Sequence, residues 1–204
     1  MSFINLTQRT LKIAPQVLLY EVGKPLMECP ETWISLPQLP GAVFGDGTHP
    51  TTRLCAGAVD FLCRQEVFLS VLDVGTGTGV LARIARARGA QFVAGTDIDS
   101  AALSAAMKNV ALDSHPVKIS ILNVAPDHWG PRFNLVVANI LEGPLRELAP
   151  KLSQALAPGG VLLLSGFTQL QIPGLQLAFV SQGLIYVNDS HLEEWALLMF
   201  RQKS

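Results

Sequence analysis

Charge is sparse in this chain, and neither sign dominates. Charged residues make up 15% of the sequence, and the formal net charge at pH 7 is -1. Proteins that bind nucleic acid usually present a broad basic surface, so this balance argues against direct nucleic-acid binding. Repeats and low-complexity tracts are absent as well. With 49% hydrophobic residues over 204 positions, the chain is long enough for one large globular domain.

Cysteines and long apolar runs are also lacking. Cys29, Cys55 and Cys63 form no Cys-x-x-Cys pair, and their odd number does not suit a disulfide framework. The first residues do not have the basic and then apolar segments of a signal peptide, and no apolar run reaches the length of a membrane span. We therefore expect a cytoplasmic protein with reduced thiols, no membrane contact and no metal site. Its oligomeric state is left open.

Residues 71–85 predict a strand, a tight loop and a helix. The apolar strand ends at Asp73-Val74, glycines follow at Gly75, Gly77 and Gly79, and an apolar helix-forming run comes next. Glycine has no Cβ, so such a loop lets backbone N–H groups approach a ligand closely. The start of the helix points further N–H groups at the same place. A nucleotide-like cofactor in contact with Gly75 and Gly77 is the expected ligand.

Two classes of cofactor compete for this loop. A dinucleotide site would need a small residue at position 80, where Val80 stands, and the third glycine comes one position early. Asp73 suits a ligand with a positive ammonium group better than a pyrophosphate. Acid-x-Gly-x-Gly-x-Gly after an apolar strand resembles motif I of class I S-adenosylmethionine (SAM) methyltransferases. The loop therefore favours SAM, with S-adenosylhomocysteine as product.

Polar residues end the later strands too. Asp97, Asn123 and Asn139 each follow a predicted strand. Parallel sheets bind ligands at the carboxyl ends of their strands, so these residues should lie near Gly75. Asp97 can accept hydrogen bonds from ribose hydroxyls or cap the helix that follows, and both roles are compatible if Asp99 or Ser100 is the cap. Asn123 is either an adenine contact or a turn residue.

Strands and helices alternate along most of the chain, which predicts an α/β fold with helices on both faces of a mostly parallel sheet. The last two strands have no helix between them and therefore imply one antiparallel strand. A Pro-Gly-Gly turn is expected at 158–160, and Pro173 and Gly174 should delay or break the last helix. The seven predicted strands cover 71–74, 91–96, 117–122, 133–138, 161–165, 183–187 and 194–200, and the predicted helices cover 53–62, 80–88, 101–112, 145–156 and 169–182.

The N-terminal segment and the loop after it are less regular. Residues 1–43 are expected to be an irregular, linker-like ribbon packed on the main body, with one strand over 17–22 and turns at its prolines. Residues 43–52 form a shaped loop before a helix. His49 and the hydroxyls beside it would either bind a carboxylate or phosphate, or simply cap the helix.

Four segments together resemble one family. They are 44–52 (Phe-Gly-Asp-Gly-Thr-His-Pro-Thr-Thr), the glycine loop, 95–99 (Gly-Thr-Asp-Ile-Asp) and 137–141 (Val-Ala-Asn-Ile-Leu). From about residue 26 to 201 the chain resembles the ribosomal large-subunit protein eleven methyltransferases, the PrmA type of class I SAM-dependent enzyme. The resemblance implies a Rossmann-like sheet of seven strands with the last one reversed. It also implies cofactor contacts at Thr52, Gly75, Asp97 and Asn139.

Two departures from the family pattern affect the expected substrate. Asp46 stands where the family usually has Thr, which adds a negative charge beside the methionine end of the cofactor. The family also has a separate N-terminal domain that presents the ribosomal protein, whereas this chain has only the ribbon 1–43 before the methyltransferase domain 44–204. The activity class follows from the resemblance, but the acceptor does not.

The resemblance implies an N-methyltransferase for protein amines, either a lysine side chain or an N-terminal amine, in a substrate that could be ribosomal. We expect Asn139 to be the catalytic residue that orients the amine and also to touch the cofactor. His49 is the only candidate for a general base. Two alternatives remain: methylation of another protein, a small amine or nucleic acid, and a SAM-binding module without catalysis. Asn139 is not followed by Pro-Pro-Tyr, which argues against planar amide or base substrates.

Overall fold

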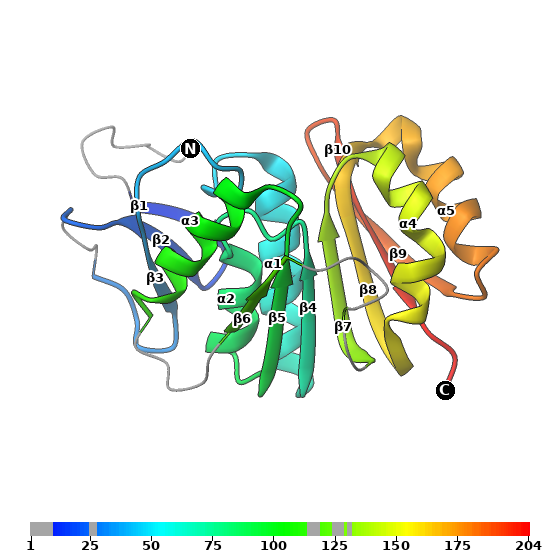
Figure 1. The fold of residues 1–204 in the computed structure, drawn as a ribbon, viewed down its shortest axis with the longest axis horizontal. Coiled ribbons are helices and arrows are strands. Elements are labelled where there is room, and N and C mark those ends of the chain that lie inside the picture. The colour runs from blue at the N-terminus through cyan, green and yellow to red at the C-terminus, as the bar shows by residue number, and fades with distance from the viewer. Residues whose placement is uncertain (1–9, 25–27, 114–118, 124–128, 130–131) are drawn as a thin grey trace.

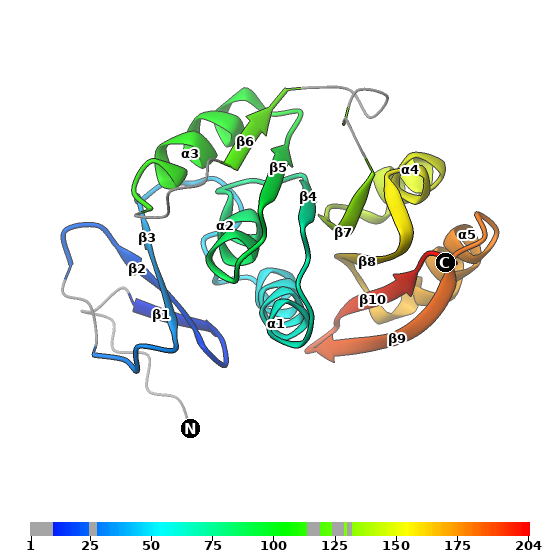
Figure 2. The same ribbon diagram turned by 90° about the horizontal axis from the view of Figure 1, so that it is seen from below.

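A computed structural model describes residues 10–24, 28–113, 119–123, 129 and 132–204, which form two sheets and their helices (Figures 1 and 2). The elements, in chain order, are β1 (Thr10–Ala14), β2 (Val17–Glu21), β3 (Ile34–Gln38), α1 (Pro50–Gln65), β4 (Ser70–Val74), α2 (Val80–Ala87), β5 (Phe92–Thr96), α3 (Ser100–Val110), β6 (Ile119–Leu122), β7 (Phe133–Asn139), α4 (Glu142–Gln154), β8 (Leu156–Thr168), the 3-10 turn η2 (Gln169–Gln171), α5 (Ile172–Val180), β9 (Ile185–Leu192) and β10 (Trp195–Arg201).

The larger sheet has the predicted architecture. Its seven strands lie in the order β6-β5-β4-β7-β8-β10-β9. Strands β4 to β8 pair in parallel, and β10 runs antiparallel to both of its neighbours. The reversal of the last strand is confirmed. From β4 the chain adds β5 and β6 on one side of the sheet, and it then crosses to the other side of β4 to add β7 and β8. Ligands in such sheets bind at this change of direction, between the carboxyl ends of β4 and β7.

Alternating side chains along each strand supply two separate cores. Val71, Val137 and Leu163 face α1 and α2, whereas Leu72, Val136 and Leu164 face α4 and α5. A period of two is what a strand buried on both faces requires. Figure 2 shows α4 on the opposite side of the sheet from α1 and α2.

Within the described chain, no helix is both long and apolar enough to span a membrane.

The N-terminal segment is more ordered than the sequence predicted. It contains the predicted strand as β2, but β1 and β3 pair with it to form a three-stranded sheet. Prolines in this segment had indicated turns, yet Pro37 lies within β3. An edge strand tolerates proline because one side of it needs no ladder hydrogen bonds, and β3 is at the edge. Figure 1 shows this sheet beside α2, and its buried side chains join the core of α1.

Two other predicted boundaries need correction, whereas a third is borne out. The Pro-Gly-Gly segment at 158–160 does not precede a strand but lies inside β8, where the pairing with β7 shifts register between Phe133 and Leu135. Helix α4 begins at Glu142, three residues earlier than predicted, because Pro144 falls in its first turn, where no N–H is needed. Helix α5 begins late, as expected, with Pro173 in its first turn.

A buried arginine connects the N-terminal sheet with the main body. Arg83 on α2 is fully buried and makes a two-point ion pair with Asp113, at 2.8 Å from Nε and 2.6 Å from Nη2. Its Nη2 also donates to the backbone oxygen of Pro37 at 2.5 Å. One guanidinium therefore joins α2, the end of α3 and β3.

Replacing Arg83 with Met should destabilise the fold by about 3–5 kcal/mol, because the carboxylate of Asp113 would stay buried without its partner. Arg201→Met is the matched control. Arg201 pairs with Glu66 on the surface, so its loss should cost about 1 kcal/mol or less. Urea denaturation of the three proteins measures both values. Similar losses for the two variants would contradict the role given to Arg83.

Candidate functional site

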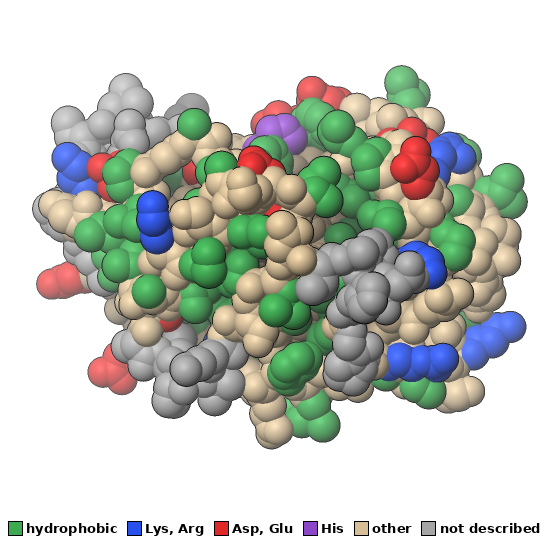
Figure 3. Space-filling view, in the orientation of Figure 1, with side chains coloured by type: hydrophobic (Ala, Val, Ile, Leu, Met, Phe, Trp, Pro, Cys, Tyr) green, Lys and Arg blue, Asp and Glu red, His purple; other side chains and the backbone are tan. Residues whose placement is uncertain are grey.

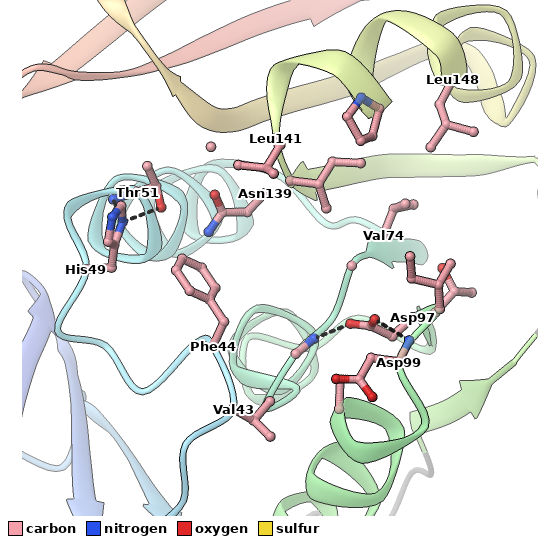
Figure 4. A pocket seen from close by; sticks show the side chains of 18 of the residues that line it. Val43, Phe44, His49, Thr51, Val74, Asp97, Asp99, Asn139, Leu141 and Leu148 are labelled. Atoms are coloured by element: carbon pink, nitrogen blue, oxygen red, sulfur yellow. Dashed lines mark hydrogen bonds between the residues drawn. The ribbon is translucent and has the colours of Figure 1, made fainter.

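One cavity of about 950 Å³ opens at the carboxyl edge of the large sheet (Figure 4). Its walls come from segments far apart in the sequence, because the parallel strands bring their carboxyl ends together. The described residues that line it include residues 42–44, 49, 51, 74, 75, 77, 96–99, 101, 102, 129, 139–141, 144, 147, 148, 166 and 195. Much of this lining is apolar, and Ile98, Leu141 and Phe44 are exposed by 100%, 70% and 49%. Such exposed apolar groups around a concave site are typical of ligand binding.

The glycine loop forms one wall, and its glycines are required by close packing. Gly75 and Gly77 line the cavity with φ angles of +70° and +54°. A Cβ on Gly75 would collide with Ile140, and one on Gly77 would collide with the backbone oxygen of Phe44. At both positions a side chain is excluded for two reasons: the positive φ angle disfavours any residue with a Cβ, and there is no space for the Cβ atom. Because these two positions carry no side chain, the loop backbone can approach a ligand in the cavity as predicted.

Asp73 supports this loop from behind. Its carboxylate is fully buried and accepts hydrogen bonds from the Thr76 hydroxyl at 2.7 Å and the Ala82 N–H at 3.2 Å. Burial raises the pKa of Asp73 from 3.8 to about 6, although both hydrogen bonds lower it. Asp73 does not line the cavity. A direct contact between Asp73 and the cofactor therefore stays a prediction, while its support of the loop is visible.

Asp97 lies at the end of β5 with its carboxylate in the cavity wall. One oxygen accepts the Gly77 N–H at 3.0 Å and the other accepts the Asp99 N–H at 3.0 Å (Figure 4). These two bonds fix the carboxylate against the glycine loop and leave each oxygen a further lone pair. Asp99 caps α3 through the Ala101 N–H at 2.8 Å, as expected. The structure thus brings Asp97, Gly75 and Gly77 into one site.

Asn139 ends β7 at the other side of the cavity. Its side chain is 9% exposed, and its Oδ1 has no hydrogen-bond partner among the described residues. An unpartnered buried carbonyl oxygen costs free energy unless a ligand or water satisfies it. In Figure 4 the Asn139 carboxamide points into the space near Thr51 and Phe44. A donor such as an amine N–H fits this position.

His49 is held as a helix cap. Its Nδ1 accepts the Thr51 N–H at 3.3 Å and lies 2.8 Å from the Thr51 hydroxyl. The ring packs between Phe44 and Trp195, with centroid distances of 5.2 and 4.6 Å. The capping interpretation of His49 is confirmed, and the imidazole also forms part of the cavity wall.

Besides Asp73, three residues singled out in the sequence lie outside the cavity lining. Thr52 is buried with its hydroxyl unpartnered among the described residues, whereas its neighbour Thr51 lines the cavity. Asn123 is exposed at the end of β6. Asp46 is exposed as well, and its Oδ1 accepts the N–H and hydroxyl of Thr48, at 3.0 and 2.6 Å. Asp46 does not line the cavity, and its effect on the methionine end of the cofactor stays a prediction.

Trp195 is the main lining residue that sequence reasoning missed. It lies at the amino end of β10, 56 positions after Asn139. The predicted reversal of the last strand could have placed Trp195 at the cavity. The first residue of an antiparallel strand lies at the same edge of the sheet as the last residues of the parallel strands beside it. No comparable signal existed for Trp129, which belongs to no described helix or strand.

Comparisons with a family model, with curated proteins and with solved structures all lead to one family. The family model for ribosomal protein L11 methyltransferase (PrmA) matches residues 17–203. Proteins named ribosomal protein L11 methyltransferase are 41% identical over 162 residues in Geobacter metallireducens and 36% identical over 164 residues in Hydrogenovibrio crunogenus, covering 79% and 80% of this chain. The chain spans about half the length of these curated relatives, 52% and 54%. A solved ribosomal protein L11 methylase from Lactobacillus delbrueckii subsp. bulgaricus superposes with a TM-score of 0.86 at 26% identity, over 96% of this chain and 99% of that one.

The raised pKa of Asp73 predicts a pH dependence of stability. Because the folded protein binds this proton more tightly than the unfolded chain, the stabilisation is fully present below about pH 4 and is lost as pH rises to about 6. The free energy of unfolding of the native sequence, relative to that of Asp73→Asn, should fall by about 3 kcal/mol across this window. Urea denaturation between these pH values, without ligand, measures the difference. Parallel profiles for the two proteins would contradict the assignment.

Proposed function

The chain belongs to the ribosomal protein L11 methyltransferase (PrmA) family, and we propose that it is a SAM-dependent N-methyltransferase acting on amino groups of a protein. The observation that carries this proposal is the buried Asn139 oxygen without a partner, in a cavity that the glycine loop and Asp97 also line. An amine donor and a nucleoside cofactor would together satisfy these groups.

The cofactor end of the cavity suits SAM. The Asp97 carboxylate would accept the ribose hydroxyls, the exposed Ile98 side chain would lie against the adenine, and Gly75 and Gly77 would leave room for the remainder. Thr52 and Asp73 are also proposed to support the methionine end, Asp73 through the loop that it stabilises. When bound, SAM supplies an electrophilic methyl group on a positively charged sulfur.

At the acceptor end, the chain must position a neutral amine. A lysine amine has an ordinary pKa of about 10.4, and burial and a nearby cation both lower it. The Asn139 oxygen accepts one N–H of the amine and so directs its lone pair along a fixed line, which is the main contribution that such a displacement needs. Phe44 and Trp195 exclude water from this end, and His49 Nδ1 is occupied by the helix cap.

The acceptor and the domain organisation follow from the family by inference. A ribosomal protein is the proposed substrate, with another protein or a small amine as the alternative. We assign the catalytic unit to residues 44–204 and treat 1–43 as the segment before it. The three-stranded sheet in that segment packs on α1 and α2 rather than on the cavity, which supports this division.

Titration calorimetry with SAM, S-adenosylhomocysteine and NAD tests the cofactor. The first two should bind and NAD should not. Asp97→Ala should weaken binding of S-adenosylhomocysteine by about 1.5–3 kcal/mol for each charge-assisted hydrogen bond lost. Asp99→Asn is the control, because asparagine caps a helix as well as aspartate does. Unchanged affinity in Asp97→Ala would refute the ribose assignment, and a folded protein that binds no SAM would refute the proposed function.

Asn139→Ala separates positioning from cofactor binding. With a labelled methyl group and ribosomal protein as acceptor, turnover should fall by about 30- to 150-fold, since an orienting hydrogen bond of about 2–3 kcal/mol is lost. The affinity for S-adenosylhomocysteine should change by less than about threefold. Asn188→Ala, at an exposed position of β9, is the control. Equal losses in turnover and affinity would reduce Asn139 to a cofactor ligand.

A further inference from the structure

One stretch of the cavity wall is held by hydrogen bonds only near its two ends. Residues 39–45, which we name the wall segment, connect β3 with the loop before α1, and residues 42–44 within it line the cavity. In Figure 4, the Phe44 ring lies on the Asn139 side of the cavity, whereas Val43 lies toward α3. The position of this one segment therefore affects both ends of the cavity.

The far end of the wall segment is bonded to the glycine loop. The N–H and the hydroxyl of Thr78 donate to the backbone oxygens of Phe44 and Gly45, at 3.0 and 2.7 Å. Residues 40–43 make no hydrogen bond with other residues that the structure describes. Ion pairs do not replace such bonds, because the wall segment has no charged side chain. In Figure 3, the lysine and arginine side chains on the visible face lie toward its left and right sides.

Asn109 supplies the anchor at the other end. Its side chain lies on α3, is 2% exposed and is not part of the cavity lining. The Oδ1 of Asn109 accepts the N–H of Leu39 at 3.0 Å, and its Nδ2 donates to the backbone oxygen of Thr78 at 3.0 Å. A carboxamide suits this place because one partner is a donor and the other is an acceptor. Thr78 is thus joined to both ends of the wall segment, directly at one end and through Asn109 at the other.

The packing of α3 brings Asn109 to this place. Ala102, Ala106 and Asn109 lie at i, i+4 and i+7, on one buried face of the helix. The small side chains let α3 approach the glycine loop, where a Cβ on Gly79 would lie 3.4 Å from that of Ala106. An apolar residue would complete such a face without needing partners, whereas a buried carboxamide costs free energy unless it is bonded. The two bonds of Asn109 therefore serve to fix position more than to fill the core.

We propose that Asn109 is a positioning residue for the cofactor, because it fixes the wall segment against the glycine loop at the separation that the cofactor needs. This inference rests on the proposed function and adds to it a residue that lies outside the cavity. A site already held in its bound arrangement has less conformational freedom to lose on binding than a site that must first be ordered. When the wall segment is free to move, only the molecules that have it in place can bind, and the apparent affinity falls by that fraction.

Asn109→Ala tests the proposal with Asn134→Ala as its matched control. Alanine removes both bonds of Asn109, favours the helix and already occupies neighbouring positions of the same face. Asn134 also joins two segments, since its Oδ1 accepts the N–H and the hydroxyl of Ser70 at 3.2 and 2.9 Å, but it does so at the amino edge of the large sheet. Titration calorimetry below the unfolding midpoint of each protein measures the affinity for S-adenosylhomocysteine. Amide hydrogen exchange follows the wall segment in the same proteins.

Asn109→Ala should bind S-adenosylhomocysteine about tenfold more weakly, and the amides of residues 39–45 should exchange faster in the ligand-free protein. In Asn134→Ala, both quantities should stay within about twofold of the native values, even if the urea midpoint falls by as much as in Asn109→Ala. A second pair of variants tests the far end. Thr78→Val loses the hydroxyl bond to Gly45 and should also bind more weakly, whereas Thr78→Ser keeps that bond and should bind as the native chain does.

The inference and the proposed function can fail separately. Native affinity in Asn109→Ala, or an equal loss in Asn134→Ala, overturns the positioning role, and so does equal binding by Thr78→Val and Thr78→Ser. An Asn109→Ala protein that does not fold overturns it as well, because the side chain would then be required by the fold itself. A folded native chain that binds neither SAM nor S-adenosylhomocysteine refutes the proposed function together with the inference, whereas native binding with an unchanged Asn109→Ala refutes the inference alone.

Discussion

The close packing of three backbone segments around the glycine loop is the constraint on which the rest of the site depends. Gly75 lies against Ile140 and Gly77 lies against the backbone of Phe44, with no space for a Cβ at either position. Thr78 then joins the segments, because its N–H and its hydroxyl donate to the backbone oxygens of Phe44 and Gly45 at 3.0 and 2.7 Å. As a result, the end that would bind a cofactor and the end that would bind an acceptor form one rigid surface.

The two ends of that surface are built in different ways. At the cofactor end, the loop backbone and Asp97 supply the polar groups, and Asp97 is fixed by bonds to Gly77 and Asp99. At the acceptor end, side chains from separate segments meet around the Asn139 carboxamide, and His49 is locked between two aromatic rings. Binding by loop backbone suits a ligand common to many proteins, whereas a pocket made of side chains from separate segments can be specific for one partner.

The sequence predicted most of the large sheet because its strands are apolar runs buried on both faces and separated by helices. The same regularity predicts Asp97 and Asn139 at one edge of the sheet. Local reasoning failed where tertiary context decides the outcome. Pro37 resembles a turn residue but occupies an edge strand, and helix geometry turns Thr51 rather than Thr52 toward the cavity. Trp195 reaches the site only because β10 is reversed.

The position of β10 has a consequence for how the protein forms during synthesis. This strand is inserted between β8 and β9, which precede it in the chain, so β9 has no neighbour in the sheet until β10 has emerged from the ribosome. Up to that moment β8 exposes an unpaired edge, and the cavity lacks the wall that Trp195 provides. A ribosome-bound intermediate would already contain the glycine loop and Asn139 while its acceptor end was still open. Completion of the cavity thus coincides with closure of the sheet.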